Sequence, residues 1–161
     1  NLGKILPFNH YCRKNIGYLY AINNNYDIIF DTDDDNLPLN NFQIFRDNEF
    51  SIIESPKFPN IYKLYTPIHM WARGFPLELI RNNEKIEYKS CKNENVGIYQ
   101  SIVDGDPDVD AIYRLTNQSY NNEITFKPNQ NFIINKDVYV SGNTQATFWV
   151  SKELFYPPTI S

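Results

Sequence analysis

The sequence predicts an α/β domain, and three neighbouring features lead to this class. Residues 12–24, CRKNIGYLYAINN, carry the apolar spacing of a helix. A continuous apolar run at 28–30 follows and is typical of a parallel strand buried on both faces. Four carboxylates then fill residues 31–35. A chain of 161 residues, 42% of them apolar, supports one sizeable core, so we predict a single domain over residues 1–161.

Helical spacing from residue 12 onward predicts an inward face made of Ile16, Leu19 and Tyr20. Asn24 and Asn25 provide the stop, since asparagine tolerates the left-handed conformation that often closes a helix.

The rest of the chain is less regular. Strands are predicted within 42–53, 61–65, 84–89, 124–126 and 132–134, a turn at 73–76, and either a helix or a strand at 96–103. A short helix at 108–115, with Asp106 or Asp108 as its N-cap, and a last helix at 144–155 complete the prediction.

The acidic cluster stands where α/β proteins bind ligands, at the carboxyl end of a buried strand. Asp31 and Asp33 are close enough to share one cation, and oxygen ligands suit Mg²⁺ or Mn²⁺. Such an ion takes its remaining ligands from water and substrate phosphates, which predicts a phosphate-containing substrate. A solvated acidic turn is the bland alternative. An EF-hand is rejected, because Asn36 replaces its glycine and Phe42 its bidentate glutamate.

A Mg²⁺-dependent phosphotransferase or phosphatase of the haloacid dehalogenase type is the other catalytic alternative. Asp31 would be its nucleophile and Asp33 its acid/base. The helix before the strand and Asp35 within the motif both fit that class poorly.

The first turn of the predicted helix is basic, with Arg13, Lys14 and Asn15 in a row. Backbone N–H groups and the helix dipole favour an anion there, and an arginine can grip a phosphate with two hydrogen bonds. Surface charges on a helix are the alternative. The helix start and the strand end together predict one site, in which cations hold phosphates and a metal joins them to carboxylates.

Charge and hydropathy exclude two classes. A net charge of −4 argues against a nucleic-acid-binding surface. The sequence contains no run of about 18 apolar residues, so it predicts no transmembrane helix. Because the chain begins at Asn1 without a methionine, we expect a piece of a longer protein.

The segment RKNIGYLYAINNNYDIIFDTDDDN resembles the core of type-A (GT-A) glycosyltransferases with their Asp-x-Asp metal motif. More narrowly, the chain resembles the STELLO-type glycosyltransferases, once grouped as a domain of unknown function. The blocks that carry this resemblance are GYLYAI with IFDTDDDN, RGFPLE at 73–78, GDPDVDAIYRLT at 105–116 and the weaker FW at 148–149.

The resemblance implies a GT-A mixed sheet flanked by helices and a transferase that uses a UDP- or GDP-sugar, Mn²⁺ or Mg²⁺, and a glycan or protein acceptor. Plant members are linked to polysaccharide synthesis in the Golgi. The matching positions imply metal binding by Asp31 and Asp33 and donor binding by Asp31, Arg13 and Asn15.

The remaining predicted roles concern the acceptor side and one further arginine. Asp108 or Asp110 is the predicted catalytic base that takes the proton of the acceptor hydroxyl. Trp71 is predicted to stack on an acceptor sugar, and Arg73 to contact a donor phosphate. Each residue also has a structural alternative. The segment with Asp108 and Asp110 could only turn the chain and cap a helix, Trp71 could pack in the core, and Arg73 could hold a loop.

One departure from GT-A enzymes concerns the start of the chain. Those enzymes have a nucleotide-binding βαβ half before the Asp-x-Asp strand, whereas only about ten residues precede the first helix here. We therefore predict the C-terminal larger part of a GT-A-like domain. A non-catalytic interaction module that keeps the fold is the third alternative.

Overall fold

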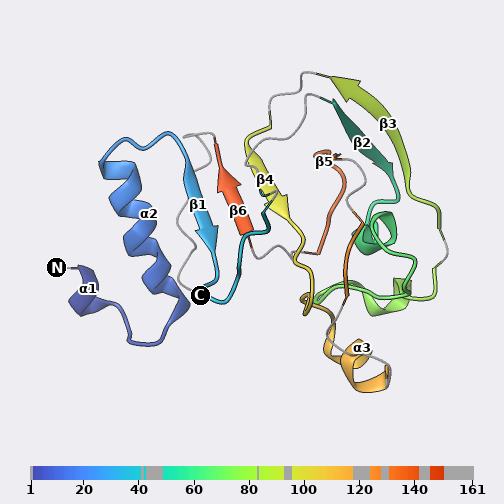
Figure 1. Cartoon of the computed structure of the whole chain (residues 1–161), viewed down its shortest axis with the longest axis horizontal. Helices are drawn as coiled ribbons and strands as arrows, with labels where there is room; N and C mark the ends of the chain where they lie inside the picture. The colour runs from blue at the N-terminus through green and yellow to red at the C-terminus, as the bar shows by residue number, and fades with distance from the viewer. Residues whose placement is uncertain are drawn as a thin grey trace.

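The computed structural model describes residues 2–40, 42, 49–82, 84–92, 96–117, 124–127, 131–141 and 146–150. The chain is mixed α/β, as predicted, with two small sheets and few helices in this part (Figure 1). The elements are α1 (Leu2–Ile5), η1 (Tyr11–Arg13), α2 (Lys14–Asn23), β1 (Ile29–Thr32), β2 (Glu49–Ser55), η2 (Ile61–Leu64), η3 (Leu77–Leu79), β3 (Glu87–Lys92), β4 (Ile98–Ser101), α3 (Ala111–Thr116), β5 (Asn131–Ile134) and β6 (Ala146–Trp149).

The first sheet has the strand order β1-β6-β4. Both outer strands are antiparallel to β6, so β1 and β4 run in the same direction, as their arrows show in Figure 1. The register aligns Asp31 with Thr147 and Thr147 with Gln100. Directly opposed residues point to the same face of a sheet, so these three side chains share one face.

Helix α2 packs on that same face. Tyr18 of α2 and Ile29 of β1 form a small buried cluster with Ala21 and Trp149 packed against it. Because α2 runs back along β1 after a turn, the start of the helix lies beside the carboxyl end of the strand (Figure 1). Phe30 lies on the opposite face, where its ring stacks on Phe148 with 4.2 Å between centroids.

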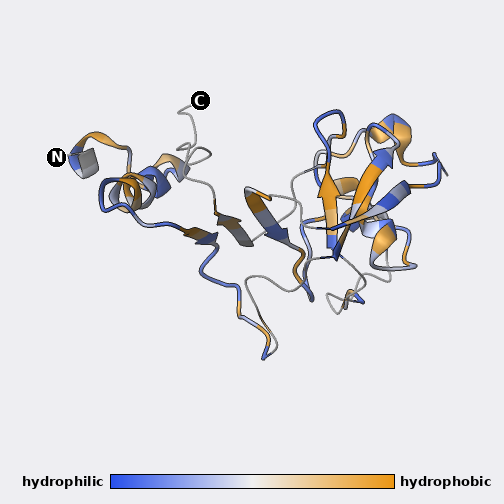
Figure 2. Ribbon diagram, turned by 90° about the horizontal axis from the view of Figure 1, so that it is seen from above, coloured by the Kyte–Doolittle hydropathy of each residue, from blue (hydrophilic) through white to orange (hydrophobic). Residues whose placement is uncertain are grey.

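The second sheet has the order β3-β2-β5, with β2 antiparallel to β3 and parallel to β5. Ile53, Ile86 and Val138 form its buried cluster. Figure 2 shows hydrophobic stretches within this sheet, at the right of the view, and they belong to β2 and β5, since β3 is mostly polar. The largest core cluster lies around residues 62–80, and the backbone bridge between Ala72 and Val109 ties it to the segment before α3.

The helix at the start of the chain is confirmed, and Asn25 closes it in the predicted left-handed conformation at φ 56°. The prediction of its buried face is wrong. Asn15 and Tyr18 face inward, whereas Leu19 and Tyr20 are exposed. Tyr18 is turned inward by packing against β1 and by a hydrogen bond to it, which spacing alone does not reveal.

The strand before the acidic cluster is confirmed, but its predicted burial on both faces is wrong. Among the residues that the structure describes, β1 is an edge strand whose paired neighbour is the antiparallel β6. Ile29 is buried under α2, while Phe30 on the other face is 47% exposed. One helix covers one face only, which explains the alternation.

Three other element predictions are wrong. The predicted strand at 61–65 is the 3-10 helix η2, closed by hydrogen bonds from the N–H groups of Tyr65 and Thr66 to the carbonyl of Tyr62. Within 124–126, Ile124 forms only an isolated bridge, to Gly105. Where the predicted last helix is described, it is strand β6, because β1 and β4 hold it on both sides; the remainder of that prediction lies outside the described residues.

The other predictions are met. The region 42–53 contains β2, the region 96–103 contains β4, and β5 matches the prediction at 132–134. The strand predicted at 84–89 begins three residues later, as β3. The turn at 73–76 is present, with Gly74 at φ 79°. Helix α3 is confirmed, although its N-cap is Asp110 and not Asp106 or Asp108.

Candidate active site

The acidic cluster and the basic helix start meet, as predicted, but through Lys14. Its ammonium lies 2.9 Å from Oδ1 of Asp31 and 3.1 Å from Oδ1 of Asp33. The side chains are 28%, 23% and 49% exposed respectively, so the group lies at the edge of the sheet and is reachable from solvent. Two carboxylates and one ammonium leave a net charge of −1 at this point.

Tyr18 fixes the other oxygen of Asp31. Its hydroxyl donates to Oδ2 at 2.6 Å, one helical turn after Lys14. Burial raises the pKa of the Tyr18 hydroxyl, and the hydrogen bond to Asp31 raises it further. Partial burial lowers the pKa of Lys14, but the hydrogen bonds to Asp31 and Asp33 and the attraction of Asp31 outweigh it, so the net shift is upward. Lys14 therefore stays charged and Tyr18 stays neutral at ordinary pH.

The backbone at the helix start is already hydrogen-bonded. His10 accepts from the N–H groups of Cys12, through Nδ1, and of Arg13, through its carbonyl. The Lys14 N–H points to the carbonyls of η1. Because these three N–H groups already have acceptors, they are not available to an anion, and the predicted anion site depends mainly on the Lys14 side chain.

Of two further residues predicted to bind the donor, Arg13 is engaged away from the cluster and Asn15 is buried. The guanidinium of Arg13 donates to the carbonyls of Gly3 and Leu6, at 3.3 Å each, and lies over the Phe8 ring. Asn15 is buried on the inward face of α2. Their contacts with a donor stay predictions.

A second group gathers the residues predicted for the acceptor side, together with Arg73, which was predicted to contact a donor phosphate. The N–H of Arg73 donates to the carbonyl of Asp108, and the N–H of Asp110 donates to the carbonyl of Trp71, at 3.2 Å each. The Arg73 guanidinium lies 2.7 Å from Oδ2 of Asp108 and is largely exposed. Asp110 caps α3, since its Oδ1 accepts from the N–H of Ile112 at 2.8 Å.

Trp71 belongs to the core and is only 8% exposed. The Tyr113 ring meets it edge to face, with 5.2 Å between centroids, and the His69 ring lies 5.8 Å away. Its position matches the alternative of core packing, and stacking on an acceptor sugar would require this packing to open.

The first sheet sets the position of the Lys14, Asp31 and Asp33 cluster relative to the Arg73–Asp108 pair. Because β1 and β4 flank β6, the strand spacing of sheets puts them about 10 Å apart. They run in the same direction, so their carboxyl ends share one edge. From that edge β1 leads into Asp33, and β4 leads through a loop with Gly105 at φ 85° towards Asp108. Gln100 of β4 is on the face that carries Asp31, in register with it across Thr147 of β6.

The fit of a divalent ion is partial. In the part of the chain that the structure describes, no group of three or more His, Cys, Asp or Glu side chains could hold a metal. Lys14 and Tyr18 engage both oxygens of Asp31. Two carboxylates suffice for Mg²⁺ or Mn²⁺ only when water and phosphate oxygens supply the other ligands. The cluster therefore fits a metal that arrives with a diphosphate better than a metal alone.

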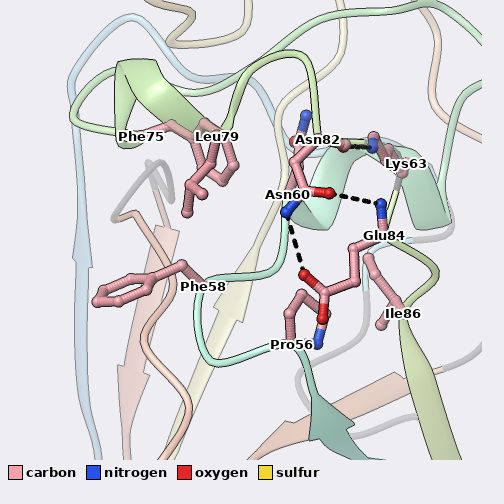
Figure 3. A pocket seen from close by; sticks show the side chains of 9 residues that line it. All are labelled: Pro56, Phe58, Asn60, Lys63, Phe75, Leu79, Asn82, Glu84 and Ile86. Carbon is pink, nitrogen blue, oxygen red and sulfur yellow. Dashed lines mark hydrogen bonds between the residues drawn. The ribbon is translucent and has the colours of Figure 1, made fainter.

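A pocket on the side of the second sheet is separate from these groups (Figure 3). In its wall the Lys63 ammonium donates to the carbonyl of Asn82, whose side chain donates to Glu84. None of the predicted site residues lines it; the lining residues are Pro56, Phe58, Asn60, Lys63, Phe75, Leu79, Asn82, Glu84 and Ile86. No helix among the described residues is long and apolar enough to cross a membrane.

Sequence reasoning named Lys14 only as part of the basic turn and missed Tyr18 and Gln100. The i, i+4 spacing of Lys14 and Tyr18 is a signal that was available, because it puts a cation and a hydroxyl on one helix face. Gln100 had no such signal, since its place depends on the pairing of β4 with β6.

Comparison with known proteins relates the chain to the STELLO-type proteins of Arabidopsis thaliana. It is 32% identical over 142 residues to the protein named probable glycosyltransferase STELLO2. The aligned region covers 76% of this chain and 18% of that protein. The chain is 29% identical over 133 residues to probable glycosyltransferase STELLO1, covering 71% and 17%. The chain thus spans about a fifth of the length of these curated relatives. No protein-family model matches it.

Proposed function

We propose that this chain is the Asp-x-Asp-bearing part of a GT-A-type glycosyltransferase that takes a sugar from a nucleotide-sugar donor. The names of its relatives support a glycosyltransferase. The observation that carries the proposal is the cluster of Lys14, Asp31 and Asp33 at the carboxyl end of β1. It stands at the sheet edge to which β4 also leads, and such an edge is where α/β folds bind ligands.

In this proposal, the donor diphosphate lies against the cluster. Asp33, the more exposed carboxylate, is the main ligand of Mn²⁺ or Mg²⁺, and Asp31 supports it. The chemistry that a divalent ion supplies at such a site is neutralisation of the leaving diphosphate. Lys14 adds a positive charge at the same point.

The acceptor side is proposed at the loop between β4 and α3. In an inverting transfer, the acceptor oxygen forms a bond to the anomeric carbon, the bond from that carbon to the diphosphate breaks, and a carboxylate takes the hydroxyl proton. Asp108 is the stronger choice of base, because Asp110 already accepts the N-capping hydrogen bond of α3. Arg73, paired with Asp108 and exposed, is placed to meet an anionic group.

The geometry favours the transferase over a phosphotransferase with Asp31 as nucleophile. A nucleophilic carboxylate needs one oxygen free to attack phosphorus. Here Lys14 engages Oδ1 of Asp31 and Tyr18 engages Oδ2. Asp31 is therefore better suited to a fixed supporting role than to attack.

Titration with UDP- and GDP-sugars, with and without Mn²⁺, tests the proposal. We expect metal-dependent binding that Asp33→Asn abolishes. Asp35→Asn is the matched control, because it removes the same charge from the same segment at an exposed position. Absence of any metal-dependent nucleotide binding by the wild-type chain, or an equal loss in both variants, contradicts the proposal. An aspartyl-phosphate formed at Asp31 would show the phosphotransferase instead.

A further inference from the structure

We propose that Lys14 is the resident counter-ion of the Asp31–Asp33 pair and that its ammonium exchanges with the divalent ion of the donor. On exchange, the ammonium moves from the carboxylates to the donor diphosphate. Lys14 is then a positioning residue that makes metal binding depend on the nucleotide. This inference rests on the proposed function and names a role within the same site.

The first argument is that the ammonium and a metal ion would need the same place. Nζ of Lys14 contacts one oxygen of each carboxylate, at 2.9 and 3.1 Å. Asp31 and Asp33 would also hold the divalent ion, and two like charges at one pair of carboxylates would repel strongly. The ammonium and the ion would therefore compete for this pair.

The second argument is that Lys14 can leave while the carboxylates stay. Its ammonium ends a flexible four-carbon chain and is partly exposed. It also lies 4.9 Å from the centre of the exposed Tyr11 ring, on the solvent side of the helix start. Asp31 is held independently by the Tyr18 hydroxyl at 2.6 Å. Departure of Lys14 thus leaves at least one carboxylate oriented for a new cation.

The third argument concerns where the ammonium goes. Both carboxylates contact it here, and a divalent ion held by them would cancel the negative charge that keeps the ammonium in place. The diphosphate oxygens would then be its new partners, because lysine binds phosphate as a compact point charge. The hydrogen-bonded backbone of η1 leaves few N–H groups to do this instead.

The experiment compares Lys14→Met with Lys4→Met, an exposed lysine in α1 whose loss changes the net charge equally. Free Mn²⁺ is measured by electron paramagnetic resonance during titration of the 161-residue chain, first alone and then with saturating UDP. Lys14→Gln is a second variant in case the methionine variant does not fold, and circular dichroism checks each chain.

We expect Lys14→Met to bind Mn²⁺ at least tenfold more tightly than wild type without UDP, and to lose at least tenfold in UDP affinity with Mn²⁺ present. Lys4→Met should match wild type in both. Unchanged Mn²⁺ affinity of the free Lys14 variants overturns the exchange, and unchanged UDP affinity overturns the move to the phosphate. Failure of the proposed function appears differently, as a wild-type chain that binds no UDP at any Mn²⁺ concentration, and the titration without UDP still decides the exchange.

Discussion

Replacement of Tyr18 by phenylalanine tests whether the hydrogen bond from Tyr18 to Asp31 stabilises the packing of α2 on β1. The ring would keep its packing on Ile29 and its edge-on contact with Trp149, at 6.4 Å and 87°, whereas the hydrogen bond to Asp31 would be lost. Hydrogen bonds to charged groups contribute about 1.5–3 kcal/mol. Asp31 is partly exposed, so water replaces some of that, and we expect a loss of about 1.5 kcal/mol.

Urea unfolding followed by circular dichroism at pH 7 measures this loss. With a slope of about 1.5 kcal/mol per molar, typical of a small domain, the midpoint should fall by about 1 M. Tyr20→Phe, on the exposed side of the same helix, is the matched control and should change the unfolding free energy by less than about 0.5 kcal/mol. Equal midpoints for the two variants would show that the hydrogen bond to Asp31 does not contribute to stability.

Three further predictions concern other parts of the molecule. Asp110→Ala should remove the N-cap of α3 and lower the free energy of unfolding in urea by about 1 kcal/mol. Asp110→Asn should keep the cap, and a full loss of stability in the asparagine variant would contradict the capping role. Burial raises the pKa of Tyr65 from 10 to about 12, so above pH 10 the unfolded chain loses a proton that the folded chain keeps, and stability falls. The decline reaches about 2.3 kcal/mol at pH 12, where half of the folded chains have lost this proton too. Tyr65→Phe should remove this contribution to the alkaline decline, and an unchanged pH profile would refute it. Trp71→Ala should destabilise by about 3–5 kcal/mol as a core truncation, and a loss below about 1 kcal/mol would instead favour a binding role for the indole.

The sequence predicted well what short-range patterns decide. The helix at the start, its asparagine stop, the following strand and the acidic end of that strand all depend on neighbours within a few residues. The joining of helix start and strand end into one site was also predictable, because a short connection forces the helix to run back along the strand. The pairing of Lys14, and not Arg13, with the carboxylates depends on helix rotation, which Tyr18 fixes through β1.

What the sequence did not predict depends on distant partners. Residues 146–149 resembled part of a helix, but β1 and β4, more than 100 and about 50 residues earlier in the chain, hold them as a central strand. This pairing also brings Gln100 to the face of Asp31. Tyr62 likewise lies in η2, within the largest buried cluster, where apolar alternation indicated a strand.

We propose that the carboxyl ends of β1 and β4 border one site, with the donor at the end of β1 and the acceptor beyond the end of β4. Amide chemical shifts of the labelled chain, recorded during titration with UDP and Mg²⁺, test it most directly. We predict that the largest shifts occur at Lys14, at Asp31 to Asp33 and around Gln100, with Asp35→Asn behaving as wild type and Asp33→Asn losing the response. Shifts confined to the pocket around Phe58 and Asn60, or no metal-dependent shifts at the strand ends, would contradict this placement of the site.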